Sequence, residues 1–125
     1  LVNYSNLFKE LKLETIIEYL QIDCEPPEVT LEVLYKIPFD DYKFCFITFE
    51  HDSYRSNVTK KESREYLINK GYTLLISDVS FNGKDSFEDW WVDEGTIINY
   101  VGNEVLQKLK NTQNTPKNIL DVFLN

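Results

Sequence analysis

The sequence predicts an α/β domain with parallel strands at the centre of a sheet and helices packed on it. Two largely apolar runs, at residues 16–23 and 44–50, each become polar at their carboxyl end. The segment between them has apolar residues at helical spacing, which is the order of a βαβ unit with parallel neighbouring strands. A polar turn at residues 82–85 separates two shorter runs, at 72–79 and 88–93. These runs predict an antiparallel hairpin.

Helices are predicted in four segments. Apolar side chains three or four residues apart indicate helices over residues 3–13 and 30–37. A third helix is expected to begin at the capping box that opens with Thr59 and to end at Gly71, because glycine readily adopts the left-handed conformation that follows many helices. The fourth is predicted over residues 96–110, where apolar residues recur at almost every fourth position.

The length of the chain, 125 residues, suits one small domain. We expect residues 1–110 to form this domain, and residues 111–125 to follow as a polar connector and a short docking tail. Because the chain begins with Leu1 rather than methionine, we expect it to be a piece of a longer protein.

The composition argues against several classes of partner. Lys and Arg number 13 against 21 Asp and Glu, which gives a net charge of −8. Phosphate contacts need clustered basic side chains, so no nucleic-acid partner is expected. No apolar run reaches the ~18 residues of a membrane span. No signal peptide opens the chain, so we expect no membrane contact and a cytoplasmic location.

The two cysteines are not expected to form a disulfide. Cys24 and Cys45 lie at levels of the predicted sheet that are roughly 16 Å apart, beyond the ~7 Å reach of a disulfide. Free thiols suit a reducing compartment. With two cysteines and one histidine in the chain, a zinc site is not expected, and no metal ligands are assigned.

Ionisable side chains follow both predicted parallel strands. Asp23 and Glu25 stand at the end of the first, and Glu50 and His51 stand at the end of the second. The carboxyl ends of parallel strands meet at one edge of a sheet, and open α/β sheets bind ligands there. We therefore assign these four residues as candidate catalytic groups. His51 has the ordinary pKa that best suits a base near neutral pH.

Each candidate also has a purely structural interpretation. His51 can be a neutral histidine that caps a strand end. Asp23 can cap backbone N–H groups, and Glu25 can lie at a helix start, where the helix dipole favours a carboxylate. Two close carboxylates can also raise one pKa or, together with Glu50, bind a cation. The use of a metal is left open.

Substrate contacts are expected from Tyr54 and Arg55, in the polar loop after the second strand, and from Trp90. Trp90 and Trp91 alternate faces, so one belongs in the core and the other can line a surface on which a sugar stacks. The loop pair can equally be solvated. No cofactor-binding residue is assigned, because the four glycines show none of the G-x-G spacing that nucleotide-binding turns need.

Several segments, in order along the chain, resemble FkbM-type methyltransferases. The first resembles the "iDxEGxExevL" signature of that family, and the others resemble its next strand, the following helix and its terminal strand. They read YLQIDCEPPE at 19–28 with LEVL at 31–34, FITFEHD at 46–52, ESREYL at 62–67 with GY at 71–72, and DWWV at 89–92.

The resemblance implies a class I S-adenosylmethionine-dependent methyltransferase with a partial Rossmann-like sheet and a C-terminal antiparallel hairpin. It implies O-methylation of a sugar or related small molecule. It also implies that only the C-terminal, acceptor-side half is present, so the fragment is expected to be inactive alone. Its partners would be the acceptor, the missing N-terminal half or a second copy. One departure is Pro26-Pro27 in place of the usual glycine and its neighbour, since proline fixes φ and removes N–H groups.

A hypothesis from another class is a non-catalytic binding or assembly module that derives from this fold and lacks the cofactor half. The absence of a glycine-rich turn favours it if the natural chain starts near Leu1. A carbohydrate-binding role for the tryptophan pair is a third possibility.

Overall fold

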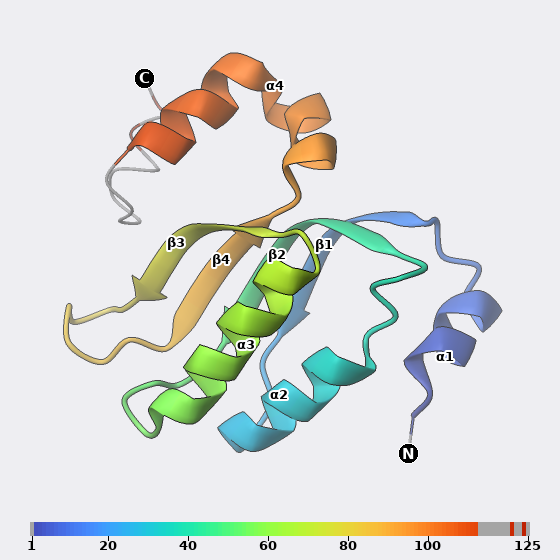
Figure 1. Ribbon diagram of the computed structural model, residues 1–125, viewed down its shortest axis with the longest axis horizontal. Helices are drawn as coiled ribbons and strands as arrows, with labels where there is room; N and C mark the ends of the chain where they lie inside the picture. The colour runs from blue at the N-terminus through green and yellow to red at the C-terminus, as the bar shows by residue number, and fades with distance from the viewer. Residues whose placement is uncertain (1, 113–120, 122–123, 125) are drawn as a thin grey trace.

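The computed structural model of the protein describes residues 2–112, 121 and 124. Within these residues, one four-stranded sheet forms the centre of the domain, and helices lie on and around it (Figure 1). The predicted α/β class is confirmed. The elements in chain order are α1 (Tyr4–Glu10), β1 (Ile16–Ile22), α2 (Pro27–Lys36), β2 (Lys43–Glu50), α3 (Asn57–Asn69), β3 (Thr73–Val79), β4 (Glu88–Val92) and α4 (Glu94–Asn111).

The sheet is mixed, and its strands lie in the order β1-β2-β4-β3. β1 and β2 are parallel neighbours, with Tyr19 opposite Phe46, which confirms the predicted parallel pair. β4 runs antiparallel to β3, as the predicted hairpin requires, and also antiparallel to β2. The sequence did not predict this insertion of β4 between β2 and β3. It places Glu88 opposite Glu50.

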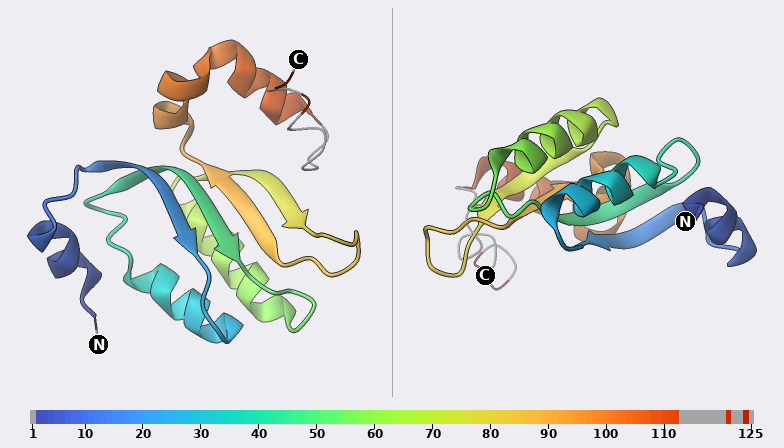
Figure 2. Two further views of the ribbon diagram at one scale, coloured as in Figure 1. Left: turned by 180° about the vertical axis from the view of Figure 1, so that it is seen from behind. Right: turned by 90° about the horizontal axis from the view of Figure 1, so that it is seen from below.

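Helices α2 and α3 cover one face of the sheet and form the main core with it (Figure 2). Leu34 of α2 and Leu67 of α3 are fully buried, together with Ile47, Phe49 and Trp91 of the strands. Full burial of an aliphatic or aromatic side chain stabilises a fold by roughly 1.5–3 kcal/mol. The main core therefore fixes β2, and with it the position of the acidic residues at its carboxyl end.

Helices α2, α3 and α4 begin earlier than the sequence predicts; α4 begins at Glu94 rather than at residue 96, because the Asp93 side chain caps it by accepting a hydrogen bond from the Thr96 N–H. α3 begins at Asn57 rather than Thr59, because the Ser56 hydroxyl accepts a hydrogen bond from the backbone N–H two residues later and so caps the helix. Thr59 is a buried residue of the first turn. α2 begins at Pro27, because a proline at the start of a helix needs no partner for an N–H.

Helix α4 bends at Gly102, whereas the sequence predicted one continuous helix over residues 96–110. Gly102 has φ of 77° and ψ of 160°, which lie outside the helical region and are readily adopted only by glycine. After the bend, Leu106 and Leu109 are buried on the sheet near Val92. The bend therefore allows the second half of α4 to cover part of the sheet that α2 and α3 leave open.

We expect Gly102→Ala to lower the free energy of unfolding by about 1–3 kcal/mol, because a side chain is strained at this positive φ. Gly95→Ala is the matched control. Gly95 lies in the helical part of α4, and an added Cβ would meet its nearest atom at an ordinary 3.7 Å. The free energy of unfolding of Gly95→Ala should stay the same or rise by up to ~1 kcal/mol. Urea unfolding followed by circular dichroism measures both, and equal stability of the two variants would contradict the strain at Gly102.

Three further expectations concern the chain as a whole. Cys24 and Cys45 are both free, as predicted. In the part of the chain that the structure describes, no helix is long and apolar enough to cross a membrane. The connector and docking tail predicted for residues 111–125 lie, beyond residue 112, almost wholly outside the described residues.

Candidate functional site: an acidic hollow at the sheet edge

An open hollow of about 500 Å³ lies at the edge of the sheet where β1 and β2 end. The loop after β2 and the loop between β3 and β4 meet at this end of the strands, away from α4 (Figure 1). Five carboxylates line the hollow, and its lining contains no Lys or Arg. The structure therefore gathers negative charge at the edge where the sequence predicted a site. The five carboxylates of this acidic hollow belong to Asp23, Glu50, Asp52, Asp85 and Glu88.

The turn after β1 is fixed by helix α2. The buried hydroxyl of Thr30 donates to the carbonyl oxygen of Cys24 at 2.7 Å and accepts a hydrogen bond from the Cys24 N–H at 3.2 Å. These two bonds hold the chain immediately after β1. They leave Asp23 at the tip of the strand, where its side chain lines the acidic hollow.

The loop after β2 is held against the loop between β3 and β4. The backbone N–H groups of His51 and Asp52 both donate to the carbonyl oxygen of Phe87, at 2.7 and 3.0 Å. The Ser53 hydroxyl donates to the carbonyl oxygen of Ser86 at 3.1 Å. Asp52 has φ of 46°, a left-handed value that aspartate tolerates better than most residues. These contacts turn the chain out of the strand and make Asp52 part of the lining of the hollow.

Glu50 lies between other carboxylates of the acidic hollow. Its place in β2 puts it opposite Glu88 of β4. Burial and the proximity of Asp23 and Asp52 raise the pKa of Glu50 to about 8. Burial also raises the pKa of Glu88, whose Oε1 accepts a hydrogen bond from Trp90 Nε1 at 2.6 Å. The hollow therefore contains a carboxyl group that keeps its proton at neutral pH.

Glu50 should make the free energy of unfolding decrease as pH rises from about 4.5 to about 8. The ordinary pKa of 4.5 applies to the unfolded chain and about 8 to the folded chain. Between these values the folded chain holds a proton that the unfolded chain has released, so raising the pH favours unfolding. Glu50→Gln should flatten this slope, whereas Glu104→Gln, at an exposed position of α4, should not. Urea unfolding across this pH range measures the slope of the free energy of unfolding against pH. Equal slopes in both variants would contradict the raised pKa of Glu50.

His51 lies on the other face of the sheet from Glu50, because consecutive strand residues alternate. Its ring is fully buried. Nδ1 accepts a hydrogen bond from the Ser53 N–H at 3.1 Å, so a neutral ring carries its proton on Nε2. Nε2 faces Asp89 Oδ1 at 3.3 Å. Both ring nitrogens are therefore engaged inside the protein.

A buried ion-pair network surrounds Asp89, beside His51. Arg64 Nε and Nη2 donate to the two oxygens of Asp89 at 2.7 and 2.9 Å, and the Asp78 N–H donates to Oδ1 at 2.9 Å. Burial opposes ionisation, but hydrogen bonds from Arg64 and His51 outweigh it and hold the pKa of Asp89 at about 2. Ligand atoms of His51, Asp78 and Asp89 lie within 4.8 Å of one another. Arg64 and Lys60 already supply positive charge there, with Lys60 Nζ 3.1 Å from Asp78.

We expect His51→Ala to lower the free energy of unfolding by roughly 2–4 kcal/mol. The variant empties a fully buried position and removes one partner each from the Ser53 N–H and the Asp89 carboxylate. His51→Asn keeps a polar side chain that can replace one of the two hydrogen bonds, so it should lower the free energy of unfolding by less than His51→Ala does. Urea unfolding of both variants measures the difference, and an alanine variant as stable as the wild type would contradict this structural role.

Glu25, Tyr54 and Arg55 lie at the rim of the acidic hollow. Arg55 Nη1 donates to Glu25 Oε2 at 2.7 Å, and both of these side chains are exposed. The lining includes Tyr54 but neither member of this ion pair. Of the four predicted catalytic residues, the structure therefore brings Asp23 and Glu50 together, and it places Glu25 and His51 apart from them.

Trp90 and Trp91 lie on opposite faces of the sheet, as predicted. Trp91 is fully buried in the main core, and Trp90 is half-buried on the other face. The Trp90 and Phe46 rings meet edge to face with their centroids 6.0 Å apart, and the Tyr19 ring stacks on the Phe46 ring with centroids 5.6 Å apart. This aromatic row of Tyr19, Phe46 and Trp90 adjoins the acidic hollow through the hydrogen bond from Trp90 to Glu88.

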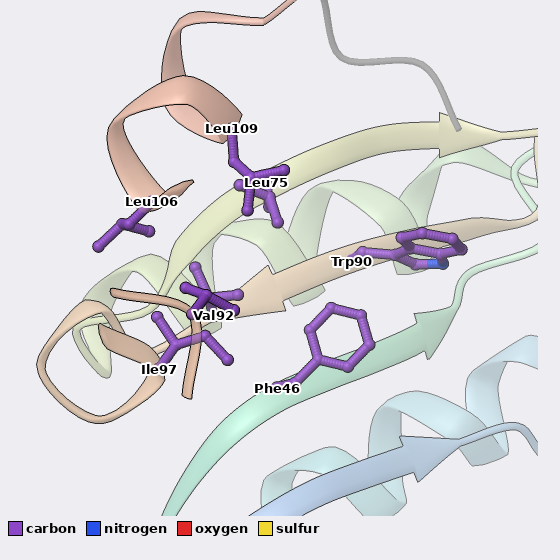
Figure 3. Close-up of a pocket in the computed structure, with 8 residues that line it drawn as sticks. Phe46, Leu75, Trp90, Val92, Ile97, Leu106 and Leu109 are labelled. Atoms are coloured by element: carbon purple, nitrogen blue, oxygen red, sulfur yellow. The ribbon is translucent and has the colours of Figure 1, made fainter. Parts of the chain in front are cut away.

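A separate cavity of about 240 Å³ lies between α4 and the same face of the sheet (Figure 3). Figure 3 shows Phe46 and Trp90 on the strands and Leu106 and Leu109 on α4 around it. The lining is apolar throughout. The cavity therefore offers no acid, base or cation ligand, and it contributes packing space rather than chemistry to the candidate site.

Asp52 and Glu88 belong to the acidic hollow but were not among the predicted site residues. Asp52 follows two of the candidates directly in the sequence, so its charge at a strand end was a usable signal. Glu88 carried no such signal, because only the insertion of β4 beside β2 brings it to Glu50.

Comparisons of this chain with protein-family models, with curated proteins and with solved structures found no match. A fold does not by itself specify a function, so the function has to be inferred from the site. The structural features that bear on it are the acidic hollow and the aromatic row.

Proposed function

We propose that this chain is the C-terminal, acceptor-side half of a class I S-adenosylmethionine-dependent O-methyltransferase similar to the FkbM type. The proposal is supported by the parallel strand pair and the antiparallel hairpin that follows it, because the resemblance implies both features. The resembling segments also fall on the elements that build the hollow. Residues 19–28 span the end of β1 and the start of α2, and residues 46–52 span the end of β2.

The observation that carries this proposal is the meeting of Asp23 and Glu50, from adjacent parallel strands, in one open hollow. Methyl transfer to oxygen requires that the acceptor hydroxyl is held in line and loses its proton. S-adenosylmethionine supplies the electrophilic methyl group when bound, and its positive sulfonium suits a hollow lined by carboxylates. The carboxylate of Asp23 would accept the proton of the acceptor hydroxyl, because Glu50 keeps its own proton at neutral pH.

The proposed acceptor, a sugar or related small molecule, is supported by the aromatic row beside the hollow. Tyr19 is half-exposed and Trp90 is partly exposed, so their rings offer flat apolar surface to a ligand. A sugar ring can place its C–H face on such a surface while its hydroxyls donate to the carboxylates of the hollow. Tyr54 lines the hollow and adds a further hydroxyl.

His51 takes a positioning role in this proposal. Its ring nitrogen binds the Ser53 N–H, and Ser53 in turn is bound to Ser86 of the loop between β3 and β4. His51 thus helps to hold the loop that carries Asp52, while the proton of the acceptor goes to a carboxylate of the hollow.

The alternative is a non-catalytic binding or assembly module. It is favoured by the four glycines, which show none of the G-x-G spacing of a cofactor-binding turn. In that case the aromatic row and the hollow would bind a saccharide without reacting with it.

Methyl transfer by the natural polypeptide that carries residues 1–125 tests the proposal, with radiolabelled S-adenosylmethionine and a panel of monosaccharides as acceptors. Asp23→Asn should lower turnover by about 10²–10⁴-fold, the usual scale for loss of a general base. Glu104→Gln on exposed α4 is the control and should leave turnover unchanged. Saccharide binding by calorimetry without methyl transfer to any acceptor would overturn the proposal and select the binding module.

A further inference from the structure

The side chain of Asp52 is only 2% exposed, and its Oδ1 has no hydrogen-bond partner. The nearest basic group, Arg55 Nη1, lies 4.0 Å from the other oxygen, Oδ2, and donates its short hydrogen bond to Glu25 instead. A buried carboxylate oxygen without a partner costs free energy, because it has lost water and gained no donor. Asp52 lines the acidic hollow, so this unpartnered oxygen belongs to a side chain that a ligand of the hollow would contact.

The carboxylates around Asp52 lack positive partners in the lining of the hollow. Asp23 and Glu50 line it together with Asp52, and no Lys or Arg does so. The network on the other face of the sheet shows the contrast, because Asp89 there receives two hydrogen bonds from Arg64. The carboxylates of the acidic hollow therefore have less compensation from basic side chains than Asp89 has.

We propose that the acidic hollow binds a hard divalent cation, Mg²⁺ or Ca²⁺, with Asp52 Oδ1 as its most buried ligand and Glu50 as a further oxygen ligand. Both ions prefer carboxylate, carbonyl and water oxygens, which is the donor set that this part of the hollow offers. At about 500 Å³ the hollow is wide enough for water molecules to complete the six to eight ligands that Ca²⁺ takes, or the octahedron of Mg²⁺.

Such a cation would keep coordination positions open on the side of the hollow that faces solvent. Hydroxyl oxygens of an acceptor could occupy them, and coordination makes a hydroxyl more acidic. This second use rests on the proposed methyl transfer, whereas binding of the cation does not. Binding is therefore tested without acceptor and without S-adenosylmethionine.

The test is calorimetric titration of the 125-residue chain, first stripped with a chelator, with CaCl₂ and with MgCl₂ in a buffer of physiological KCl concentration. At least one of the two ions should bind saturably at one site, with a Kd of about 10⁻⁵–10⁻³ M, within the range of carboxylate-rich protein sites. The melting temperature should rise with the same ion as the site fills. The absence of saturable binding of both ions would overturn the proposal.

Three variants separate a site from diffuse attraction by an acidic protein. Asp52→Asn keeps the shape of the side chain and tolerates the left-handed φ, and Glu50→Gln is a second isosteric change in case the first does not fold. Each should weaken binding at least tenfold. Asp85→Asn is the matched control, because this substitution also removes a carboxylate from the lining of the hollow. Asp85 differs from Asp52 in that it is exposed and accepts a hydrogen bond from Asn82.

The control variant should bind within about twofold of the wild type. Equal weakening by all three variants, together with loss of binding when KCl is raised, would identify non-specific screening and overturn the proposal. Circular dichroism confirms that each variant is folded before it is titrated. With the cation absent, Asp52→Asn should also melt at a higher temperature than the wild type, because it removes a buried charge from beside other carboxylates.

Discussion

The buried carboxylate of Asp89 is the interaction on which the arrangement of the domain depends. It lies on β4 and binds Arg64 of α3, His51 at the end of β2 and the backbone of Asp78 in β3. One side chain therefore joins four elements that lie apart in the sequence. Removal of one partner from a buried ion pair typically costs about 3–5 kcal/mol, because the other charge is left without compensation. This network fixes β4 in its place between β2 and β3.

The insertion of β4 in turn builds the site. It brings Glu88 opposite Glu50, and it brings the carbonyl oxygen of Phe87 to the loop after β2, which then turns Asp52 inward. The carboxylates on the two faces of the sheet have different partners. Asp89 receives cationic partners from the chain, whereas the carboxylates of the hollow share a proton or require a cation from solution. Strongly perturbed carboxylates in an open cleft are typical of functional sites, and this contrast is why we locate the chemistry in the hollow.

The proposed methyl transfer and the proposed cation site use different carboxylates of the same hollow, so the two proposals are compatible. A divalent cation held by Asp52 and Glu50 would offset the repulsion within the hollow and orient hydroxyl oxygens beside the aromatic row. Asp23, on the neighbouring strand, would then be the carboxylate best placed to accept a proton. The aromatic row adds apolar surface without charge, so binding of the acceptor and its deprotonation would rest on different groups.

The sequence by itself determined the elements and much of their pairing. Apolar periodicity, a polar turn and Gly71, which takes φ of 89°, were enough for the βαβ unit, the hairpin and the end of α3. The start of α3 was predicted wrongly, because Ser56 caps the helix in place of Thr59. The bend in α4 was not predicted, because Gly102 lies within a regular apolar pattern that indicates a continuous helix.

Of the candidate site, the sequence determined that Asp23 and Glu50 share one edge, because parallel strands align their carboxyl ends. Only the tertiary structure decided that His51 lies on the opposite face from Glu50, that Asp52 turns into the hollow and that Glu88 joins it. The physical reason is that strand order depends on partners distant in the chain. Alternation assigns a residue to a face, but the segment that covers that face is chosen by packing of the whole domain.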